Sequence, residues 1–246
     1  MRYLMTISYD GSKYKGYQKQ PKCKTIQNEI EKALKKINGD KAIEIQASGR
    51  TDAKVHAINQ KAHFDMETDM TCFNIKKALN SLLPGDIYIR EVETVSDTFH
   101  ARYNVKAKEY IYKINMGEYD PIQKDYVYQH NKRLDVVEME RALKYLEGTH
   151  DFKSFTKANE EKEDFERTII QTNLFRDMKA VNLITISFLG TGFMRYMVRN
   201  MVGTLIEIGE GKKKSEDIIE IIDAKDRRKA GITANPEGLY LKDVFY

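Results

Sequence analysis

Residues 48–57 read Ser-Gly-Arg-Thr-Asp-Ala-Lys-Val-His-Ala and separate two stretches, 43–47 and 60–64, whose composition is typical of β-strands. Successive side chains of an extended chain point to opposite sides, so Arg50 and Asp52 share one side. A guanidinium stabilises the charged form of a nearby carboxylate, and a charged, fixed carboxylate can act as a nucleophile. A solvated turn with a weak surface ion pair accounts for the same two residues. The stretch therefore predicts a strand-loop-strand unit and leaves both interpretations of its loop open.

The residues on either side of this unit complete a β-α-β-β-α-β order. From Tyr3 to Tyr9 apolar and polar residues alternate, which indicates a strand with one buried face. Thr25 is a good N-cap, apolar residues then recur at helical spacing, and Gly39 supplies a stop. We predict strands at 3–9, 43–47, 60–64 and 87–92 and helices at 26–37 and 74–82.

A looser version of the same order follows. Asp135 and Glu138 form a helix-capping pair, and Gly148 ends that helix. We predict further strands at 106–114, 168–175, 183–189 and 239–245 and further helices at 194–208 and 215–222. This order is that of the ferredoxin-like unit. The predicted fold class is therefore α+β, with two ferredoxin-like halves at 1–104 and 105–246, mainly antiparallel sheets, and a cleft between the halves.

The composition is that of an ordinary globular protein. The 246 residues are 41% hydrophobic and 32% charged, with no apolar run of membrane-spanning length. Cys23 and Cys72 are far apart and no histidine spacing fits a zinc site, so we expect neither a disulfide nor a metal. Two free thiols suit a reducing compartment, and we place the chain in the cytoplasm.

Basic residues are concentrated near the N-terminus. The net charge of +4 is too small to indicate nucleic-acid binding by itself. Residues 11–28 contain no acidic residue, and their lysines alternate with Tyr14 and Tyr17. Such a mixture favours phosphate contacts with base stacking, although a solvated lysine loop has the same composition. The lysines are Lys13, Lys15, Lys19, Lys22 and Lys24.

Seven motifs, taken together, are specific. They are Tyr9-Asp10-Gly11-Ser12, Gly16-Tyr17-Gln18, the 48–57 stretch, Leu83-Pro84-Gly85-Asp86, Phe99-His100-Ala101-Arg102, Met197-Val198-Arg199-Asn200 and Glu237-Gly238-Leu239-Tyr240-Leu241. In order and spacing this set resembles the TruA-type tRNA pseudouridine synthases over essentially the whole chain. The resemblance implies two α/β subdomains around an RNA-binding cleft. It also implies a homodimer that isomerises uridines 38, 39 and 40 in the tRNA anticodon stem-loop.

The implied reaction assigns a role to Asp52. Isomerisation breaks the glycosidic carbon-nitrogen bond, turns the uracil and rejoins it through carbon, so we expect no cofactor and no metal. The carboxylate acts covalently or by removing a proton from the sugar, and the sequence does not separate the two routes. A uridine in a stem is out of reach until the enzyme flips it out of the stack.

The resemblance assigns substrate-binding roles to five more residues. Arg50 fills the vacated space or grips the backbone, unless it only pairs with Asp52. Tyr110 stacks on the target base, although Tyr112 shares its face and physical reasoning does not separate the two. Arg199 lies on an apolar helix, where its charge needs a partner such as Asp52. Leu239 packs against the uracil or is simply a core strand residue, and Arg102 contacts the RNA backbone.

Two positions depart from the pattern. Lys54 stands where the family usually has glycine, and a left-handed backbone there costs a lysine roughly 1 kcal/mol. Tyr17 replaces a common tryptophan and preserves the ability to stack. Lys54 is the only hint of the alternative substrate, ribosomal RNA. A non-catalytic RNA-binding protein is the third hypothesis, and the retention of Asp52, Arg50, Tyr110 and Arg199 argues against it.

Overall fold

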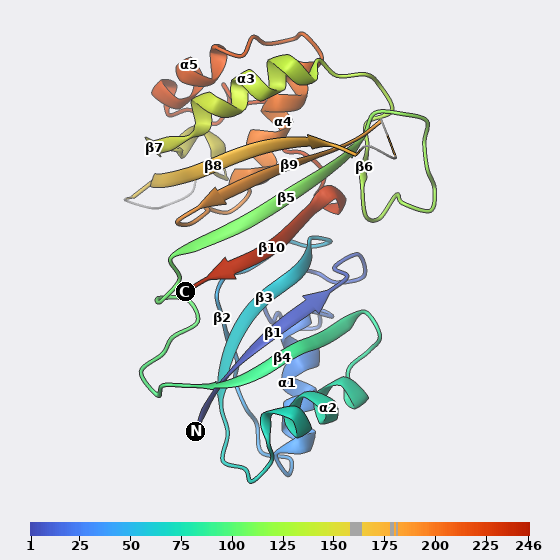
Figure 1. Cartoon of the computed structure of the whole chain (residues 1–246), viewed down its shortest axis with the longest axis vertical. Helices are drawn as coiled ribbons and strands as arrows, with labels where there is room; N and C mark the ends of the chain where they lie inside the picture. The colour runs from blue at the N-terminus through green and yellow to red at the C-terminus, as the bar shows by residue number, and fades with distance from the viewer. Residues whose placement is uncertain (158–163, 178–179, 181) are drawn as a thin grey trace. The chain divides into compact units, whose positions relative to one another are not determined.

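The computed structural model describes residues 1–157, 164–177, 180 and 182–246. These residues form two compact units, Met1–Lys106 with Tyr240–Tyr246 (unit 1) and Ala107–Leu239 (unit 2). The described residues contain ten strands and five α-helices, which makes the fold mixed α+β (Figure 1). All strand pairs described below are antiparallel except two, β10 with β3 and β6 with β5.

Unit 1 is a sheet covered on one face by two helices (Figure 1). Its elements are β1 (Arg2–Tyr9), α1 (Ile26–Ile37), β2 (Gln46–Ala47), β3 (His56–Asp65), α2 (Cys72–Leu82), β4 (Ile87–Val95) and the last strand of the chain, β10 (Leu239–Phe245). The strand order is β4-β1-β3-β10, and β2 pairs with β3. Tyr240 lies opposite His56 in the parallel β10–β3 pair.

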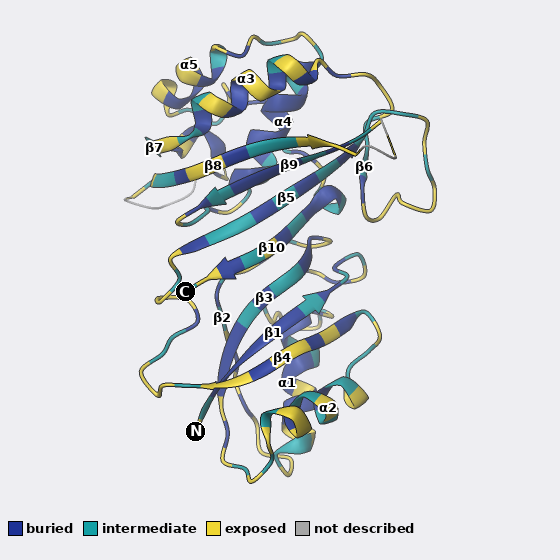
Figure 2. Ribbon diagram, in the orientation of Figure 1, coloured by how far each residue is buried: buried dark blue, intermediate teal, exposed yellow. Residues whose placement is uncertain are grey.

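Helix caps and strand patterns in unit 1 can be compared directly with those predicted from the sequence. Thr25 Oγ1 accepts from Asn28 N at 3.4 Å and begins α1. Thr71 Oγ1 accepts from Asn74 N at 3.2 Å and begins α2. The odd-numbered residues of β1 are buried as predicted, but Leu4 and Thr6 are buried too, so the expectation of a single buried face was wrong (Figure 2). β1 is a central strand, paired with β3 and β4 on its two edges. The predicted strand at 43–47 is shorter than expected, because only Gln46–Ala47 pairs with β3.

In unit 2, three helices cover one face of the strands (Figure 1). Its elements are β5 (Ala107–Asn115), β6 (Tyr128–Gln129), α3 (Val136–Leu146), β7 (Gly148–Asp151), a 3-10 turn (Lys153–Phe155), β8 (Glu166–Arg176), β9 (Leu183–Gly190), α4 (Met197–Gly209), α5 (Asp217–Ala224) and a second 3-10 turn (Pro236–Gly238). The strand order is β5-β9-β8-β7, with β6 beside β5. Asp135 caps α3 by accepting from Glu138 N, as predicted.

Helix α4 is the central helix of unit 2. All its residues are buried except Arg199 and Glu207 (Figure 2). It begins at Met197 and not at 194, because Tyr196 adopts a left-handed backbone with φ 64° that no helical turn contains. Neither α4 nor any other helix of the described residues has the length and apolar character needed to span a bilayer.

Candidate active site

The loop that carries Asp52 is held by main-chain hydrogen bonds. Tyr17 N donates to Thr51 O at 3.1 Å, and Lys54 N donates to Tyr14 O at 3.3 Å. Val55 N donates to Asp52 O at 3.2 Å, which closes a turn directly after the carboxylate. Asp52 is therefore flanked on both sides by residues whose backbone is fixed, while its own side chain stays partly exposed.

Two glycines allow the 10–17 loop to lie against the Asp52 loop. A Cβ on Gly11 would overlap Val55 O, and a Cβ on Gly16 would lie 2.9 Å from Thr51 O. Gly16 also has φ +95°, a conformation that L side chains rarely adopt. His56 Nδ1 accepts from Gly11 N at 3.1 Å and fixes the start of the same loop. The first two motifs of the chain therefore support the Asp52 loop.

Buried polar side chains also hold the Asp52 loop through hydrogen bonds. Tyr9 Oη and Thr51 Oγ1 share a hydrogen bond of 2.8 Å. Ser48 Oγ donates to Gln60 Oε1 at 2.6 Å, and Gln60 Nε2 donates to Gly49 O at 3.1 Å. Burial raises the pKa of Tyr9, so its hydroxyl stays protonated. Sequence reasoning did not assign these supporting residues, although Ser48, Thr51 and Tyr9 belong to the quoted motifs.

Lys54 adopts the left-handed backbone that makes a lysine unfavourable. Its φ is 65°, and its side chain is exposed. The turn after Asp52 therefore carries strain of roughly 1 kcal/mol. Arg50, also exposed, lies two residues before the carboxylate.

The lysine-rich stretch differs from the expectation in one respect. Tyr14 and Tyr17 are each only 2% exposed, so neither presents a ring for base stacking. Tyr14 donates its hydroxyl to Asp86, and Lys24 Nζ lies 4.5 Å from the centre of the Tyr14 ring. The expectation of stacking was wrong because both rings turn into the core. The five lysines themselves are exposed, which leaves a basic surface.

The two candidate tyrosines of β5, Tyr110 and Tyr112, make different contacts in unit 2. Tyr112 is fully buried and donates its hydroxyl to Asn235 O at 2.7 Å. Tyr110 is 8% exposed, and its ring meets Phe193 edge to face at 5.1 Å between centroids. Both tyrosines are therefore buried in unit 2, and the role of Tyr110 towards a base stays a prediction.

Arg199 is held in one orientation within unit 2. Its Nε donates to Ala234 O at 2.8 Å, and Ala234 N donates to Arg199 O at 3.0 Å. Its guanidinium carbon lies 5.1 Å from the centre of the Tyr196 ring. These contacts fix the plane of the guanidinium. Leu239 is buried and directly follows the turn in which Gly238 packs against Tyr112.

Arg102 is not close to Asp52. Ala101 N donates to His63 Nδ1, near the end of β3, whereas Asp52 precedes the first residue of that strand. Seven residues of extended chain separate His56 from His63, on the order of 20 Å. Arg102 is exposed beside Tyr103. Arg50 thus shares the loop of Asp52, two residues away in the chain, whereas Arg102 lies at the opposite end of β3.

The histidines have structural contacts. His56, His63 and His100 each accept a backbone N–H through Nδ1, from Gly11, Ala101 and Arg102 respectively. Among the residues that the structure describes, no three His, Cys, Asp or Glu side chains are grouped to hold a metal ion. Cys23 and Cys72 are free thiols.

The candidate residues divide between the units. Asp52, Arg50 and Arg102 lie in unit 1, and Tyr110, Arg199 and Leu239 lie in unit 2. Sequence reasoning missed a third group, the buried polar residues around Asn200 and Arg227, although Asn200 belongs to a quoted motif.

Comparison with known proteins bears on the whole chain. A family model described as tRNA pseudouridine synthase matches residues 5–104 and 142–246. Proteins named tRNA pseudouridine synthase A match from Geobacillus sp. (strain WCH70), at 44% identity over 246 residues, and from Exiguobacterium sp. (strain ATCC BAA-1283 / AT1b), at 45% over 245 residues. Each match covers 100% of this chain and 98% of the relative. A relative of the same name from Oceanobacillus iheyensis is 45% identical over 248 residues, which cover 100% of this chain and 96% of that protein.

A chain from a solved structure, the archaeal box H/ACA sRNP Nop10-Cbf5 complex, aligns at 10% identity with a TM-score of 0.34, over 92% of this chain and 59% of that one. This similarity is too low to bear on the fold. The family model, in contrast, covers the residues around both Asp52 and Arg199, and the relatives match the whole chain. The chain belongs to the tRNA pseudouridine synthase family.

Proposed function

We propose that the protein isomerises uridine to pseudouridine in tRNA, at the anticodon stem-loop, with Asp52 as the essential carboxylate. The observation that carries the proposal is the Asp52 loop. Its backbone is fixed from both sides by residues of the family motifs, while Asp52 itself is only partly buried. A fixed backbone under an accessible carboxylate is the arrangement that a positioned nucleophile or base requires.

The chemistry needs one carboxylate and a flipped nucleotide. The bond between the sugar C1′ and N1 of uracil breaks, the base turns, and C1′ bonds to C5. C5 then loses its proton, and N1 gains one. Asp52 either attacks C1′ and later leaves it, or removes a proton from the sugar and returns it. Both routes use the carboxylate in its charged form.

The other residues bind the flipped nucleotide and its neighbours. Tyr110 stacks on the base, and Leu239 packs against it. Arg199 presents a guanidinium of fixed orientation, and Arg50 occupies the space that the nucleotide vacates. Arg102 and the exposed lysines of residues 13–24 contact phosphates farther away, so binding weakens as salt rises.

Three further statements belong to the same proposal. Both units are ferredoxin-like, which the β-α-β-β-α-β order of β1 to β4 in unit 1 supports. The protein acts as a homodimer, as the resemblance implies. It works in the cytoplasm, where its tRNA substrate and a reducing environment for two free thiols occur together.

The test is pseudouridine mapping on an unmodified tRNA transcript incubated with purified protein and no added cofactor. We expect product in the anticodon stem-loop with the natural protein, and none with Asp52→Asn or Asp52→Ala. Asp69→Asn is the matched control, because Asp69 is an exposed aspartate of the same unit. Product that persists in Asp52→Asn would refute the assigned role. Product in ribosomal RNA but not in tRNA would establish the alternative substrate.

A further inference from the structure

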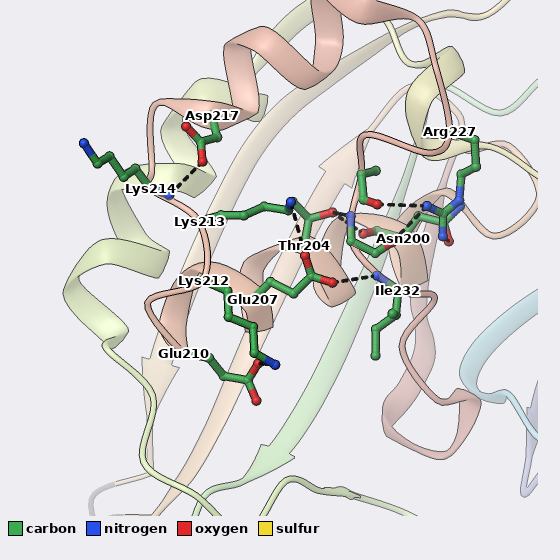
Figure 3. A network of polar contacts seen from close by, with 12 residues as sticks. Asn200, Thr204, Glu207, Glu210, Lys212, Lys213, Lys214, Asp217, Arg227 and Ile232 are labelled. Atoms are coloured by element: carbon green, nitrogen blue, oxygen red, sulfur yellow. Dashed lines mark hydrogen bonds and ion pairs between the residues drawn. The ribbon is translucent and has the colours of Figure 1, made fainter.

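A half-buried arginine that the reaction does not require lies beside α4. Arg227 Nη1 donates to Gly231 O at 2.8 Å and to Ala230 O at 3.3 Å. Its Nη2 donates to Asn200 Oδ1 and to Thr233 Oγ1, both at 3.0 Å (Figure 3). One side chain thus joins α4 to the 230–233 segment.

Asn200 completes this network. The residue is fully buried, and its Nδ2 donates to Phe155 O at 2.7 Å and to Thr156 O at 3.0 Å. Its Oδ1 accepts from Arg227 and also from Thr233 Oγ1, at 2.7 Å. Every donor and acceptor of the amide is therefore used, as a buried amide requires.

The same segment is pressed onto α4 at two more points. Thr204 Oγ1 accepts from Gly231 N at 2.9 Å, and Glu207 Oε1 accepts from Ile232 N at 3.0 Å (Figure 3). A Cβ on Gly203 would overlap Ile232 O, so only glycine permits this approach. The backbone at 231–234 consequently has a single well-defined position relative to the helix.

That position determines where Arg199 points. Asn200 directly follows Arg199 and Thr233 directly precedes Ala234, so the network adjoins the Arg199–Ala234 pair on both chain segments. With Nε bound to Ala234 O, the guanidinium plane is set by a carbonyl whose neighbours are fixed. A half-buried guanidinium loses part of its hydration. The four hydrogen bonds of Arg227 offset that cost and at the same time fix the segment that carries Ala234.

We propose that Arg227, Asn200 and Thr233, the Arg227 clamp, are positioning residues that orient Arg199 for catalysis. This inference rests on the proposed function, since it assigns Arg199 to the reacting nucleotide. Misplacing a substrate-binding group by about 1 Å reduces rates by up to about 100-fold. The clamp therefore affects the chemical step more than the affinity for RNA.

The experiment compares Thr233→Val, which removes the hydroxyl at constant shape, with Thr233→Ser, which retains it. Single-turnover pseudouridine formation at saturating enzyme should slow roughly tenfold in Thr233→Val and recover in Thr233→Ser. The Kd for tRNA should change by less than about threefold. Arg227→Lys keeps the charge but loses the fork, and should match Thr233→Val. Arg228→Lys is the control, because Arg228 is 89% exposed and pairs only with Asp226 among the described residues.

A measurement that does not depend on activity tests the Arg227 clamp separately from the proposed function. Nitrogen-15 NMR should show the Arg199 Nε–H exchanging slowly with solvent in the natural protein and in Thr233→Ser, and faster in Thr233→Val. A natural protein inactive on tRNA would refute the proposed function, while the exchange data would still decide the clamp. The clamp proposal would be overturned if Thr233→Val lowered the Tm but left both the reaction rate and the Nε–H exchange of Arg199 unchanged. If Thr233→Val does not fold, Arg227→Lys serves the same comparison.

Discussion

The two units hold their candidate site residues by different means. In unit 1 the residues next to Asp52 are bound by main-chain hydrogen bonds from the 10–17 loop, and the side chains of Tyr9 and Gln60 add further support to the loop. In unit 2 Arg199 is fixed by a carbonyl that depends on a buried network of side chains. A loop supported by backbone should tolerate changes of side-chain polarity, whereas a guanidinium supported by side chains should not.

The largest expected effect is a loss of stability that the two units should share. Each unit contains a glycine whose Cα lies so close to a backbone carbonyl that no side chain fits, so here the difference between the units should disappear. Gly11→Ala and Gly203→Ala each place a methyl group into a backbone carbonyl, of Val55 and of Ile232. We expect each to lower the free energy of unfolding by about 3 kcal/mol or more. Urea unfolding measures this, with Gly85→Ala as control, since a Cβ at Gly85 meets nothing within 4 Å. A loss below about 1 kcal/mol in either variant would mean that the loop concerned moves freely.

The next substitution, Thr51→Val in unit 1, is the counterpart of Thr233→Val in unit 2 and allows the reaction rates of the two variants to be compared. Thr51→Val removes the hydrogen bond to Tyr9 and should cost about 1–2 kcal/mol in stability. The single-turnover rate should stay within about threefold of the natural protein, because the bonds through Thr51 O and Lys54 N remain. A tenfold slower reaction in Thr51→Val would show that unit 1 also depends on side-chain support.

A smaller effect is the pH dependence of stability, to which a histidine of each unit contributes. Burial, Arg2 and His100 lower the pKa of His63 in unit 1 to about 4, against the opposing charge of Asp65. The unfolded chain takes up this proton below its ordinary value near 6.5, so stability falls as pH drops from about 6.5 to about 4. Allowing for partial contact with solvent, the loss at pH 5 is about 1 kcal/mol.

His130 in unit 2 shifts in the same direction, chiefly through burial, with Glu210 opposing and Lys132 and Lys212 assisting. Urea midpoints between pH 7 and pH 5 should therefore depend less on pH in His63→Gln than in the natural protein, and less again when His130→Gln is added. The carboxylates with lowered pKa values contribute mainly below this range. An unchanged slope in His63→Gln would contradict the assignment.

The smallest effect concerns backbone strain. Lys54→Gly relieves a positive φ of 65°, at the cost of a more flexible unfolded chain, so we expect a gain of less than about 1 kcal/mol. Lys225→Gly in unit 2 is the matched variant, because Lys225 has φ 49° and ends α5. Chemical denaturation should show both gains. Destabilisation by Lys54→Gly alone would indicate that its side chain supports the Asp52 loop.

Much of the secondary structure followed from local signals. Thr25 and Asp135 began their helices as predicted, and the last strand occupies the predicted residues. The start of α4 was predicted at 194 and is at Met197, because nothing in the local sequence indicates that Tyr196 adopts a left-handed backbone. Strands β6 and β7 have two and four residues, too few for an alternating pattern to be recognised.

The site was less predictable, because tertiary contacts decide which side chains are buried. Tyr14 and Tyr17 lie in a lysine-rich loop yet turn inward. Arg227 and Arg228 are adjacent in a charged run that suggests full solvation, but only Arg228 is exposed. The separation of Arg102 from Asp52 depends on which end of β3 each residue adjoins. Sequence spacing does not contain that information.

The pairing of β10 with β3 means that unit 1 is not continuous in the chain. Residues 1–106 are synthesised well before the strand that lies beside His56 and Ala57, which is made from Leu239–Phe245. Until β10 has been made, the edge of β3 at His56 and Ala57 lacks its partner strand, and an unpaired edge is a template for wrong association. A chain that stops before β10 therefore has a first unit that lacks one of its strands.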